Sequence, residues 1–558
     1  MVQRRNKRWD SRNVERRGVF FLGLVVCLLL SFPYFEELRN ANEMPRILQA
    51  LAWLNDGVLH LDTPATRGFS PGPDVARGVG GHLFPNKPPG GTAVAVAGVV
   101  AARVTEAALG IDATLRSATW WTRLFGGVLP LLLLAASVVR TDGGGARRFW
   151  AAAGALTLLC FATPIFSYGR LAYGNMWSAL LLYAGVTNLV GHGDKERIPA
   201  PAWGGMLAGA AVLFEYVAVF AALPIAVMLL ARVGRDGGLR ELLWAVVGAL
   251  IPVGALMAYH DHAFGSPWST GYHNAANAVF SAKHQEGVLG LVGPSWRGFS
   301  TQILDPGAGL LWWAPGALLG MFGLGWMGLR GTDELTRRRG TTMLAVMLVV
   351  IMIVVSLNFE GGWRVGPRYL VVVLPCMLPG ICFGLEHERR GVFLAAWGIA
   401  LGVGALPNVL AATMWPHFDL THVGNPVGEV LLPLLREGVE PYGPLTMAGV
   451  TRGTTWVALL GAAGMLFMVA GSVGGSRRED RGIIGVLTLV VGFCISAWIW
   501  TTPEHGDQPA ANLSYIRAHY EPRVGAPESR KLPVLTNKRL ERFNTKSGSR
   551  SRLGGKKR

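Results

Sequence analysis

Long apolar runs alternate with short charged segments along most of the chain. The first run, residues 18–34, follows a basic segment and has no obvious small-residue cleavage site after it, so we interpret it as a retained membrane helix. A helix needs about 20 apolar residues to cross a bilayer. Several runs are shorter, so the pattern does not fix the residues at which these spans begin and end. The pattern predicts twelve further spans near residues 119–139, 151–167, 175–190, 204–217, 219–232, 241–260, 309–329, 341–358, 369–385, 391–414, 454–474 and 483–501.

Basic residues gather in alternate connections between these runs. Cytoplasmic loops carry an excess of lysine and arginine, so these connections and the N-terminus are predicted to lie in the cytoplasm. Thirteen spans fit if the apolar stretch 91–104 is interfacial or re-entrant, and the C-terminal tail is then outside. The segments 35–118, 261–308, 359–368 and 415–453 are also outside, and long loops in compact proteins are usually functional. The basic groups are Arg147 and Arg148, Lys195 and Arg197, Arg232 and Arg235, Arg337 to Arg339, Arg389 and Arg390, and Arg477 and Arg478.

Composition agrees with a membrane protein. Hydrophobic residues make up 51% of the 558 residues, charged residues only 16%, and the mean hydropathy is +0.35. Soluble domains carry about 25% charged residues, so a soluble enzyme, a disordered protein and a secreted disulfide scaffold are unfavoured. The five cysteines lie in apolar runs without CxxC spacing, and they indicate buried side chains instead of disulfides or zinc ligands.

The net charge of +17 lies mostly at the two ends of the chain. Residues 1–17 carry a net +5 and form a basic cytoplasmic N-terminus. Residues 502–558 carry a net +8 and are predicted to be disordered or to contact anionic lipid head groups. Membrane lipids are therefore the expected partners of the charged ends. No nucleic-acid partner is expected, because such binding requires basic residues on a folded face.

The first outer segment carries the most informative chemistry. Glu43 and Arg46 are three residues apart and share a helical face, while Ile47, Leu48 and later leucines have helical spacing. We predict an amphipathic helix at the membrane surface, with Lys87 facing it from a proline-rich turn. A carboxylate can take a proton from an attacking hydroxyl, and the cations can neutralise a lipid phosphate. The alternative is an exposed ion pair and an ordinary turn lysine.

The run from Asn42 to Gly90 resembles the first outer loop of the GT-C membrane glycosyltransferases. The resemblance is to the bacterial branch related to lipid-A aminoarabinose transferase and protein O-mannosyltransferases. That branch has an acidic residue with arginine three positions on, then an amphipathic helix, then an aromatic-x-(Asn/Glu/Asp)-Lys-(Pro/Ala)-Pro motif. Glu43 and Arg46 match the first element, with glutamate where aspartate is frequent. The second element is matched by Phe84-Pro85-Asn86-Lys87-Pro88-Pro89-Gly90.

Four later stretches extend this resemblance over about 330 residues, and their order and spacing carry it more than any single stretch. They are Glu215-Tyr216, then Phe264-Gly265-Ser266-Pro267 with Gly271-Tyr272, then Asp305 to Pro315, and finally Gly361-Gly362-Trp363-Arg364-Val365-Gly366-Pro367-Arg368-Tyr369. The resemblance implies that Glu43 is the general base or binds the acceptor. It also implies that Lys87 holds the donor phosphate and that Arg46 orients either group. Arg368 is a second phosphate ligand or, equally, an arginine reaching to the interface.

Further candidates for lining the cavity or binding the acceptor come from the outer segments. Asp74 could bind acceptor or a divalent ion, or could be an exposed loop acid. His260 and Asp261 indicate a polar helix end, and Tyr272 could line the cavity or lie on the surface. Trp363 lies inside a motif, whereas the other tryptophans near span ends suggest an aromatic belt. The full set is Asp74, His82, Asn86, His260, Asp261, Tyr272, Glu360 and Trp363.

The expected fold is an all-α polytopic membrane protein of about thirteen spans, with a transferase-like membrane domain over residues 18–501. The resemblance implies inverting transfer of a hexosyl or pentosyl group from a polyprenyl-phosphate donor to a hydroxyl on a lipid, glycan or protein acceptor. It implies a site on the outer face of a bacterial inner membrane. No cofactor or metal motif is evident, although a divalent cation would be compatible.

Two other functions remain open. A transporter or lipid-linked glycan flippase would also be polytopic, but transporters usually place ionisable residues near the membrane midplane. An O-antigen type polymerase or ligase would carry a single very large outer loop late in the chain.

Overall fold

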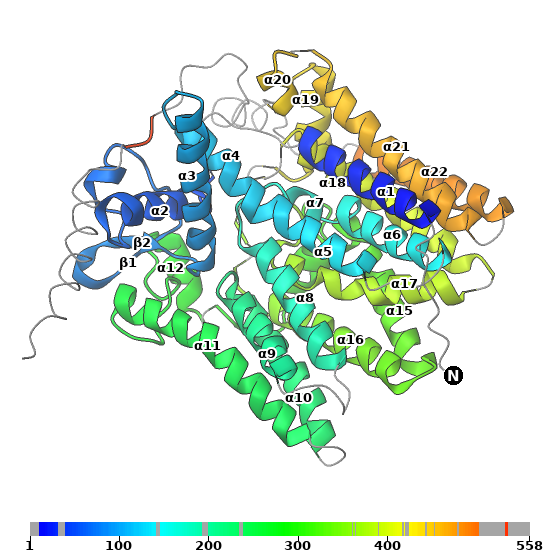
Figure 1. Cartoon of the computed structure of the whole chain (residues 1–558), viewed down its shortest axis with the longest axis horizontal. Helices are drawn as coiled ribbons and strands as arrows, with labels where there is room; N and C mark the ends of the chain where they lie inside the picture. The colour runs from blue at the N-terminus through cyan, green and yellow to red at the C-terminus, as the bar shows by residue number, and fades with distance from the viewer. Residues whose placement is uncertain are drawn as a thin grey trace, which may run out of the picture.

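The protein is built almost entirely from helices (Figure 1). The computed structural model describes residues 11–31, 40–140, 146–191, 199–233, 238–288, 290–359, 361–362, 364–388, 390–415, 418, 423–440, 443–450, 452–476, 479–501 and 531–533. Within these ranges the strands form one two-stranded hairpin. Eight helical segments there are long and apolar enough to cross a membrane, so the chain is an all-α, multi-pass membrane protein. They are Gly90–Ala108, Leu115–Val139, Tyr216–Val233, Gly238–Phe264, Glu334–Val355, Val392–Thr413, Thr454–Gly475 and Arg481–Thr501.

Every apolar run predicted to span the membrane contains helix in the part of the chain that the structure describes, although the run 369–385 begins as 3-10 turns and residues 32–34 of the first run lie outside the described residues. The number of crossings, thirteen, stays a prediction, because several of these helices are shorter than a full span. In the first half of the chain the helices are α1 (Ser11–Leu30), α2 (Met44–Asp56), α3 (Gly90–Ala108), α4 (Leu115–Arg123), α5 (Leu129–Arg140), α6 (Ala146–Phe161), α7 (Ile165–Tyr168), α8 (Asn175–Gly191), α9 (Pro199–Val212), α10 (Ala222–Val233) and α11 (Gly238–Phe264).

The second half continues the same plan. Its helices are α12 (Ala278–Gln285), α13 (Trp296–Phe299), α14 (Leu310–Trp313), α15 (Gly316–Arg330), α16 (Glu334–Val355), α17 (Leu378–His387), α18 (Val392–Thr413), α19 (Leu432–Arg436), α20 (Pro444–Met447), α21 (Thr454–Gly475) and α22 (Glu479–Thr501). Short 3-10 or π-helical turns extend or join them. These are η1 (Pro64–Thr66), η2 (Val79–Gly81), η3 (Leu124–Val128), η4 (Tyr216–Ala221), η5 (Ser300–Leu304), η6 (Arg368–Val372), η7 (Leu374–Met377) and η8 (Val427–Leu431).

The outer faces of the long helices are apolar, as contact with lipid requires. On α11, Leu243, Leu250 and Ile251 are exposed. The opposite face of α11 packs on α9, where an added Cβ at Gly205 would lie 1.9 Å from the carbonyl oxygen of Ala245. Close backbone approach through small residues is how membrane helices associate without a hydrophobic driving force.

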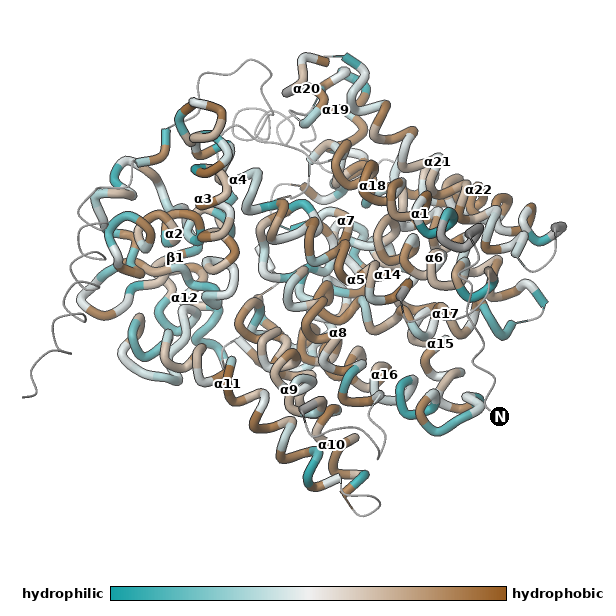
Figure 2. Tube along the Cα trace, viewed as in Figure 1, coloured by the Kyte–Doolittle hydropathy of each residue, from teal (hydrophilic) through white to brown (hydrophobic). Residues whose placement is uncertain are grey.

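Two of the segments predicted to be outside, 35–118 and 261–308, lie together at one end of the molecule (Figure 1). Helices α2, α3 and α12 lie together with the hairpin on the left of Figure 1, away from helices α10 and α22. Polar residues are frequent at this end in Figure 2. An isolated bridge between Ala76 and Ala275 ties the first outer segment to the outer segment 261–308. Which side of the membrane this end faces stays a prediction.

The predicted amphipathic helix of the first outer segment is present as α2. Glu43 is its N-cap residue and Pro45 lies in its first turn, where a missing N–H costs little. Ile47, Leu48 and Leu51 are buried in a cluster shared with α3. The helix is confirmed, and its apolar face packs on protein, while its position at the membrane surface stays a prediction.

The stretch 91–104 lies within α3, an unbroken helix of 19 residues. A re-entrant segment turns back on itself, and this helix contains no turn. It is long and apolar enough to cross. Its direction in Figure 1 differs from that shared by α11, α21 and α22. An interfacial position therefore remains open for α3, and the prediction of a turn within 91–104 is not supported.

A short piece of the C-terminal tail is placed on the first outer segment. Leu532 is buried beside α2 and α3, and its N–H donates to the carbonyl of Ala113 at 2.7 Å. The carbonyl of Pro533 accepts hydrogen bonds from Asn55 and Arg103. Residues 531–533 are thus on the same side as the first outer segment. The remainder of the tail and the basic residues 1–10 lie outside the described residues.

Candidate functional site

A cavity of about 530 Å³ opens where three of the predicted outer segments meet. Its volume is within the range of small-molecule sites, about 300–1,000 Å³. Segments 35–118, 261–308 and 359–368 all contribute to its wall, so residues as far apart in sequence as Asn40 and Arg368 converge on it. The lining residues are Asn40, Ala41, Asn42, Pro73, Asp74, Lys87, Tyr173, Val279, Phe280, Lys283, Arg297, Phe359, Gly361, Gly362, Arg364 and Arg368.

The wall of this cavity is strongly cationic. Five of its described lining residues are basic, namely Lys87, Lys283, Arg297, Arg364 and Arg368. Asp74 is the only carboxylate among the described lining residues, and it is buried. Converging guanidinium and ammonium groups suit an anion such as phosphate, because charge-assisted hydrogen bonds are stronger than neutral ones.

The β-hairpin brings Asp74 and Lys87 to the same wall. Strand β1 (Val75–Arg77) pairs antiparallel with β2 (Leu83–Pro85), with Val75 opposite Pro85. The open end of the hairpin is closed by the N–H of Asn86, which donates to the carbonyl of Asp74 at 3.2 Å. Asp74 precedes β1 and Lys87 follows β2, so the pairing of the two strands places these residues next to each other.

Lys87 is held against an aromatic platform. Its Nζ donates to the hydroxyl of Tyr272 at 3.1 Å and lies 4.6 Å from the centre of the Tyr272 ring. His284 stacks on Tyr272, with ring centres 4.5 Å apart. Burial lowers the pKa of His284 to about 4, and the neighbouring charge of Lys87 acts in the same direction. His284 is therefore neutral at pH 7, and it adds no further positive charge beside Lys87.

Arg368 joins two outer segments. Its Nη2 donates to Asn42 Oδ1 at 3.0 Å, and its Nη1 donates to the carbonyl of Gly361 at 3.2 Å. Its guanidinium lies 5.0 Å from the centre of the Tyr173 ring. The buried Nε of Arg368 has no hydrogen-bond partner in the structure. Arg368 is thus a buried cation in the cavity wall with donor capacity to spare.

Glu43 and Arg46 do not pair with each other. The Glu43 carboxylate accepts from Arg123 Nη2 at 2.7 Å and Nε at 3.1 Å, and from the N–H of Ala172 at 2.5 Å. Arg46 Nη1 donates to the carbonyl of the same Ala172 at 3.0 Å. Glu43 is fully buried and does not line the cavity. The two residues hold Ala172, next to the cavity residue Tyr173, from both sides of its backbone.

Arg46 also has a buried acidic neighbour. Among the described residues, its Nε and Nη2 have no hydrogen-bond partner, and neither does Glu215 Oε1, although both side chains are about 1% exposed. Burial lowers the pKa of Arg46, and the charge of Glu215 opposes that effect. Unmatched buried donors and acceptors are costly, so this pair forms a polar region with unmet hydrogen-bonding capacity behind the cavity.

The other candidates from the sequence have varied positions. His260 bonds the Tyr216 hydroxyl at 2.9 Å, and Tyr216 packs on Tyr272, so His260 supports the Lys87 platform from behind. Asp261 is exposed at the end of α11. Asn86 is buried outside the cavity lining, and His82 faces Asp62 on the surface. Glu360 and Trp363 lie outside the described residues.

Several residues of the site were missed from sequence. Asn42 and Arg364 lie inside the quoted motifs, and Arg123 is an ionisable residue in a predicted span, a signal that marks functional or structural positions. Lys283 lies on α12 and Arg297 on α13, in the outer segment 261–308, where no motif marked them. Their roles depend on α12 and α13 folding back over the cavity.

Comparisons with known proteins gave no match to a family model and no match among curated proteins. The structure is similar to solved structures of ArnT from Cupriavidus metallidurans. The apo structure is 16% identical, with 87% of this chain and 76% of that chain covered and a TM-score of 0.47. The structure bound to undecaprenyl phosphate is 16% identical, with 86% and 76% covered and a TM-score of 0.45. Both values are low, so the likeness by itself indicates no function for this chain.

Proposed function

We propose that this protein is an integral-membrane glycosyltransferase that uses a polyprenyl-phosphate-linked sugar as donor and a hydroxyl-bearing molecule as acceptor. The observation that carries the proposal is the cavity with five basic side chains and one carboxylate, at the end of a bundle of lipid-facing helices. The GT-C-like motifs support it, because Lys87 of one motif and Arg368 of another both lie in this wall. The reaction is placed at the outer face on the basis of the charge pattern of the loops.

The donor phosphate is assigned to Lys87 and Arg368. Lys87 has one known hydrogen bond, to Tyr272, so two of its three ammonium protons remain for a ligand. Arg368 has an unused buried Nε. Preorganised cations of this kind stabilise the negative charge that develops on a departing phosphate.

Asp74 is proposed as the general base. The acceptor oxygen attacks the anomeric carbon, the bond from that carbon to the phosphate oxygen breaks, and the electron pair leaves with polyprenyl phosphate. The hydroxyl proton passes to Asp74. A single displacement of this type inverts the anomeric configuration.

Glu43 is proposed as a positioning residue. The resemblance implies that it is the base, and that role stays a prediction. Its oxygens accept three hydrogen bonds from Arg123 and Ala172, and it does not line the cavity. The buried ion pair holds the Ala172–Tyr173 backbone, and Tyr173 in turn faces Arg368.

The test is an acceptor-dependent transfer assay. The purified protein in lipid should release polyprenyl phosphate from a lipid-linked sugar only when acceptor is present. Lys87→Ala should lower kcat/KM by about 100-fold or more, since a preorganised charge is lost at the reacting phosphate. Arg77→Ala is the matched control, because Arg77 is an exposed basic residue of the same hairpin. Equal activity of the Lys87→Ala and Arg77→Ala proteins would refute the site.

The same preparation discriminates the alternative functions. A transporter or flippase moves the lipid-linked sugar across the bilayer of a sealed vesicle and leaves the sugar–phosphate bond intact. Translocation without bond cleavage would overturn the enzyme proposal. The cavity's charges favour chemistry, since they gather at one end of the bundle.

A further inference from the structure

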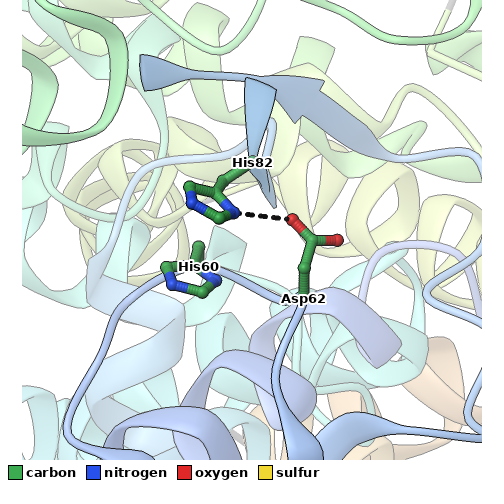
Figure 3. A group of neighbouring side chains, drawn as sticks. All are labelled: His60, Asp62 and His82. Carbon is green, nitrogen blue, oxygen red and sulfur yellow. Dashed lines mark hydrogen bonds and ion pairs between the residues drawn. The ribbon is translucent and has the colours of Figure 1, made fainter. Parts of the chain in front are cut away.

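A second cluster of chemistry-bearing side chains lies outside the cavity, on the surface of the first outer segment. His60 and Asp62 come from the turn between α2 and η1, and His82 comes from the residue before β2 (Figure 3). One ligand atom from each residue lies within 4.8 Å of the others. Two imidazoles and a carboxylate are ligands typical of zinc sites.

The distances are close to those that a metal ion requires. Zinc bonds of about 2.0–2.2 Å in a tetrahedral arrangement place neighbouring ligand atoms about 3.3–3.6 Å apart. His82 Nδ1 and Asp62 Oδ2 are 3.3 Å apart. The rings of His60 and His82 lie face to face with centres 3.9 Å apart, so both imidazoles lie close to the Asp62 carboxylate.

Two further contacts distinguish this cluster from an ordinary surface ion pair. His60 Nδ1 is buried and has no hydrogen-bond partner in the structure, which an ion pair between Asp62 and His82 leaves unexplained. The N–H of Leu83 donates to Asp62 Oδ2 at 2.7 Å and fixes the carboxylate, as outer contacts of metal ligands do. Asp62 and His82 are 41% and 46% exposed, so an ion can reach them from solvent.

We propose that His60, Asp62 and His82 form a binding site for a divalent cation of the zinc class, with water or an incoming group as the fourth ligand. The ion connects the turn after α2 to strand β2. Because β2 continues directly into Asn86 and Lys87, bound metal fixes the hairpin that carries Lys87. The proposal concerns metal binding and the stability of the hairpin, and it does not depend on the proposed transfer reaction.

The test measures bound metal. The full chain in detergent is stripped with a chelator, dialysed, reloaded with Zn²⁺ or Co²⁺ and analysed by elemental mass spectrometry and Co²⁺ absorption. We expect about one ion per chain, a tetrahedral Co²⁺ spectrum, and affinity lowered by roughly 100-fold in His82→Asn and Asp62→Asn. His273→Asn, at an exposed histidine of another loop, is the control and should bind normally.

Melting temperature separates metal loss from misfolding. Wild-type protein should melt at a higher temperature with Zn²⁺, whereas His82→Asn should match wild type only in chelator. The proposal is overturned by wild-type protein that retains no ion, or by variants that retain it like His273→Asn.

Discussion

Glu43 and Asp74 come from the same outer segment, yet their surroundings are opposite. Glu43 is fully buried and bonded to Arg123 and Ala172, whereas Asp74 lies in the wall of the cavity. A general base must reach the proton that it abstracts. Position therefore favours Asp74 for proton transfer and Glu43 for support.

This difference can be measured with two isosteric variants. Asp74→Asn should lower kcat by about 100-fold or more with donor affinity within a few fold of wild type, because only proton transfer is lost. Glu43→Gln should weaken donor affinity and lower the melting temperature, because a buried ion pair loses a partner. The opposite result, with full activity in Asp74→Asn and loss of kcat alone in Glu43→Gln, would show that Glu43 is the base.

A single residue, His284, is also expected to make the stability of the protein depend on pH. Its folded-state pKa of about 4 lies below the ordinary value of 6.5, so the unfolded chain binds the proton more tightly. Its contribution to stability is complete above pH 6.5 and is lost as the pH falls from there to 4. The melting temperature of His284→Phe, which keeps a ring on Tyr272, should therefore fall less than that of wild type between pH 7 and 5. An equal fall in both proteins would contradict this assignment.

At the scale of elements, the sequence predicted the features that depend on a single helix and missed those that depend on contacts between elements. Apolar runs located the long helices such as α1, α11 and α22, and helical spacing located α2, because both patterns are local, whereas the short helices α12, α13, α19 and α20 were not predicted. The Glu43–Arg46 pair was not formed, because Arg123 and Ala172 come from elements that no local spacing reveals. The hairpin that joins Asp74 to Lys87 has strands of only three residues, too short for an alternating pattern to show.

Packing between α9 and α11 gives a prediction for these elements. Gly205→Ala should lower the melting temperature and cost about 1–3 kcal/mol, since its Cβ would meet the Ala245 carbonyl at 1.9 Å. Gly254→Ala on α11 is the matched control, because an added Cβ there has no heavy atom within 4 Å. Thermal unfolding in detergent compares the two, and equal melting temperatures would contradict the close packing.

At the scale of the whole molecule, residues 531–533 of the tail lie on the same side as the first outer segment. Lys531 pairs with Asp112 at 2.6 Å, and Leu532 is buried beside them. This agrees with an odd number of crossings between a cytoplasmic N-terminus and an external tail. The contact of Lys531 and Leu532 with the first outer segment was not predicted from the sequence.

Sidedness can be tested with cysteines in a chain whose own cysteines are replaced. Lys531→Cys and Val79→Cys should react with a membrane-impermeant thiol reagent on intact cells, since Val79 is exposed on the first outer segment. Leu239→Cys, exposed near the α10–α11 turn, should react only after the membrane is opened. Reaction of Lys531→Cys together with Leu239→Cys would place the tail on the other side.

The position of the donor phosphate tests the central claim most directly. A cryo-electron microscopy structure of the protein in lipid nanodiscs with polyprenyl phosphate should show phosphate density inside the cavity, about 2.7–3.0 Å from Lys87 Nζ and a guanidinium nitrogen of Arg368. Phosphate density elsewhere, with Lys87 bonded to Tyr272 and no ligand in the cavity, would contradict the account.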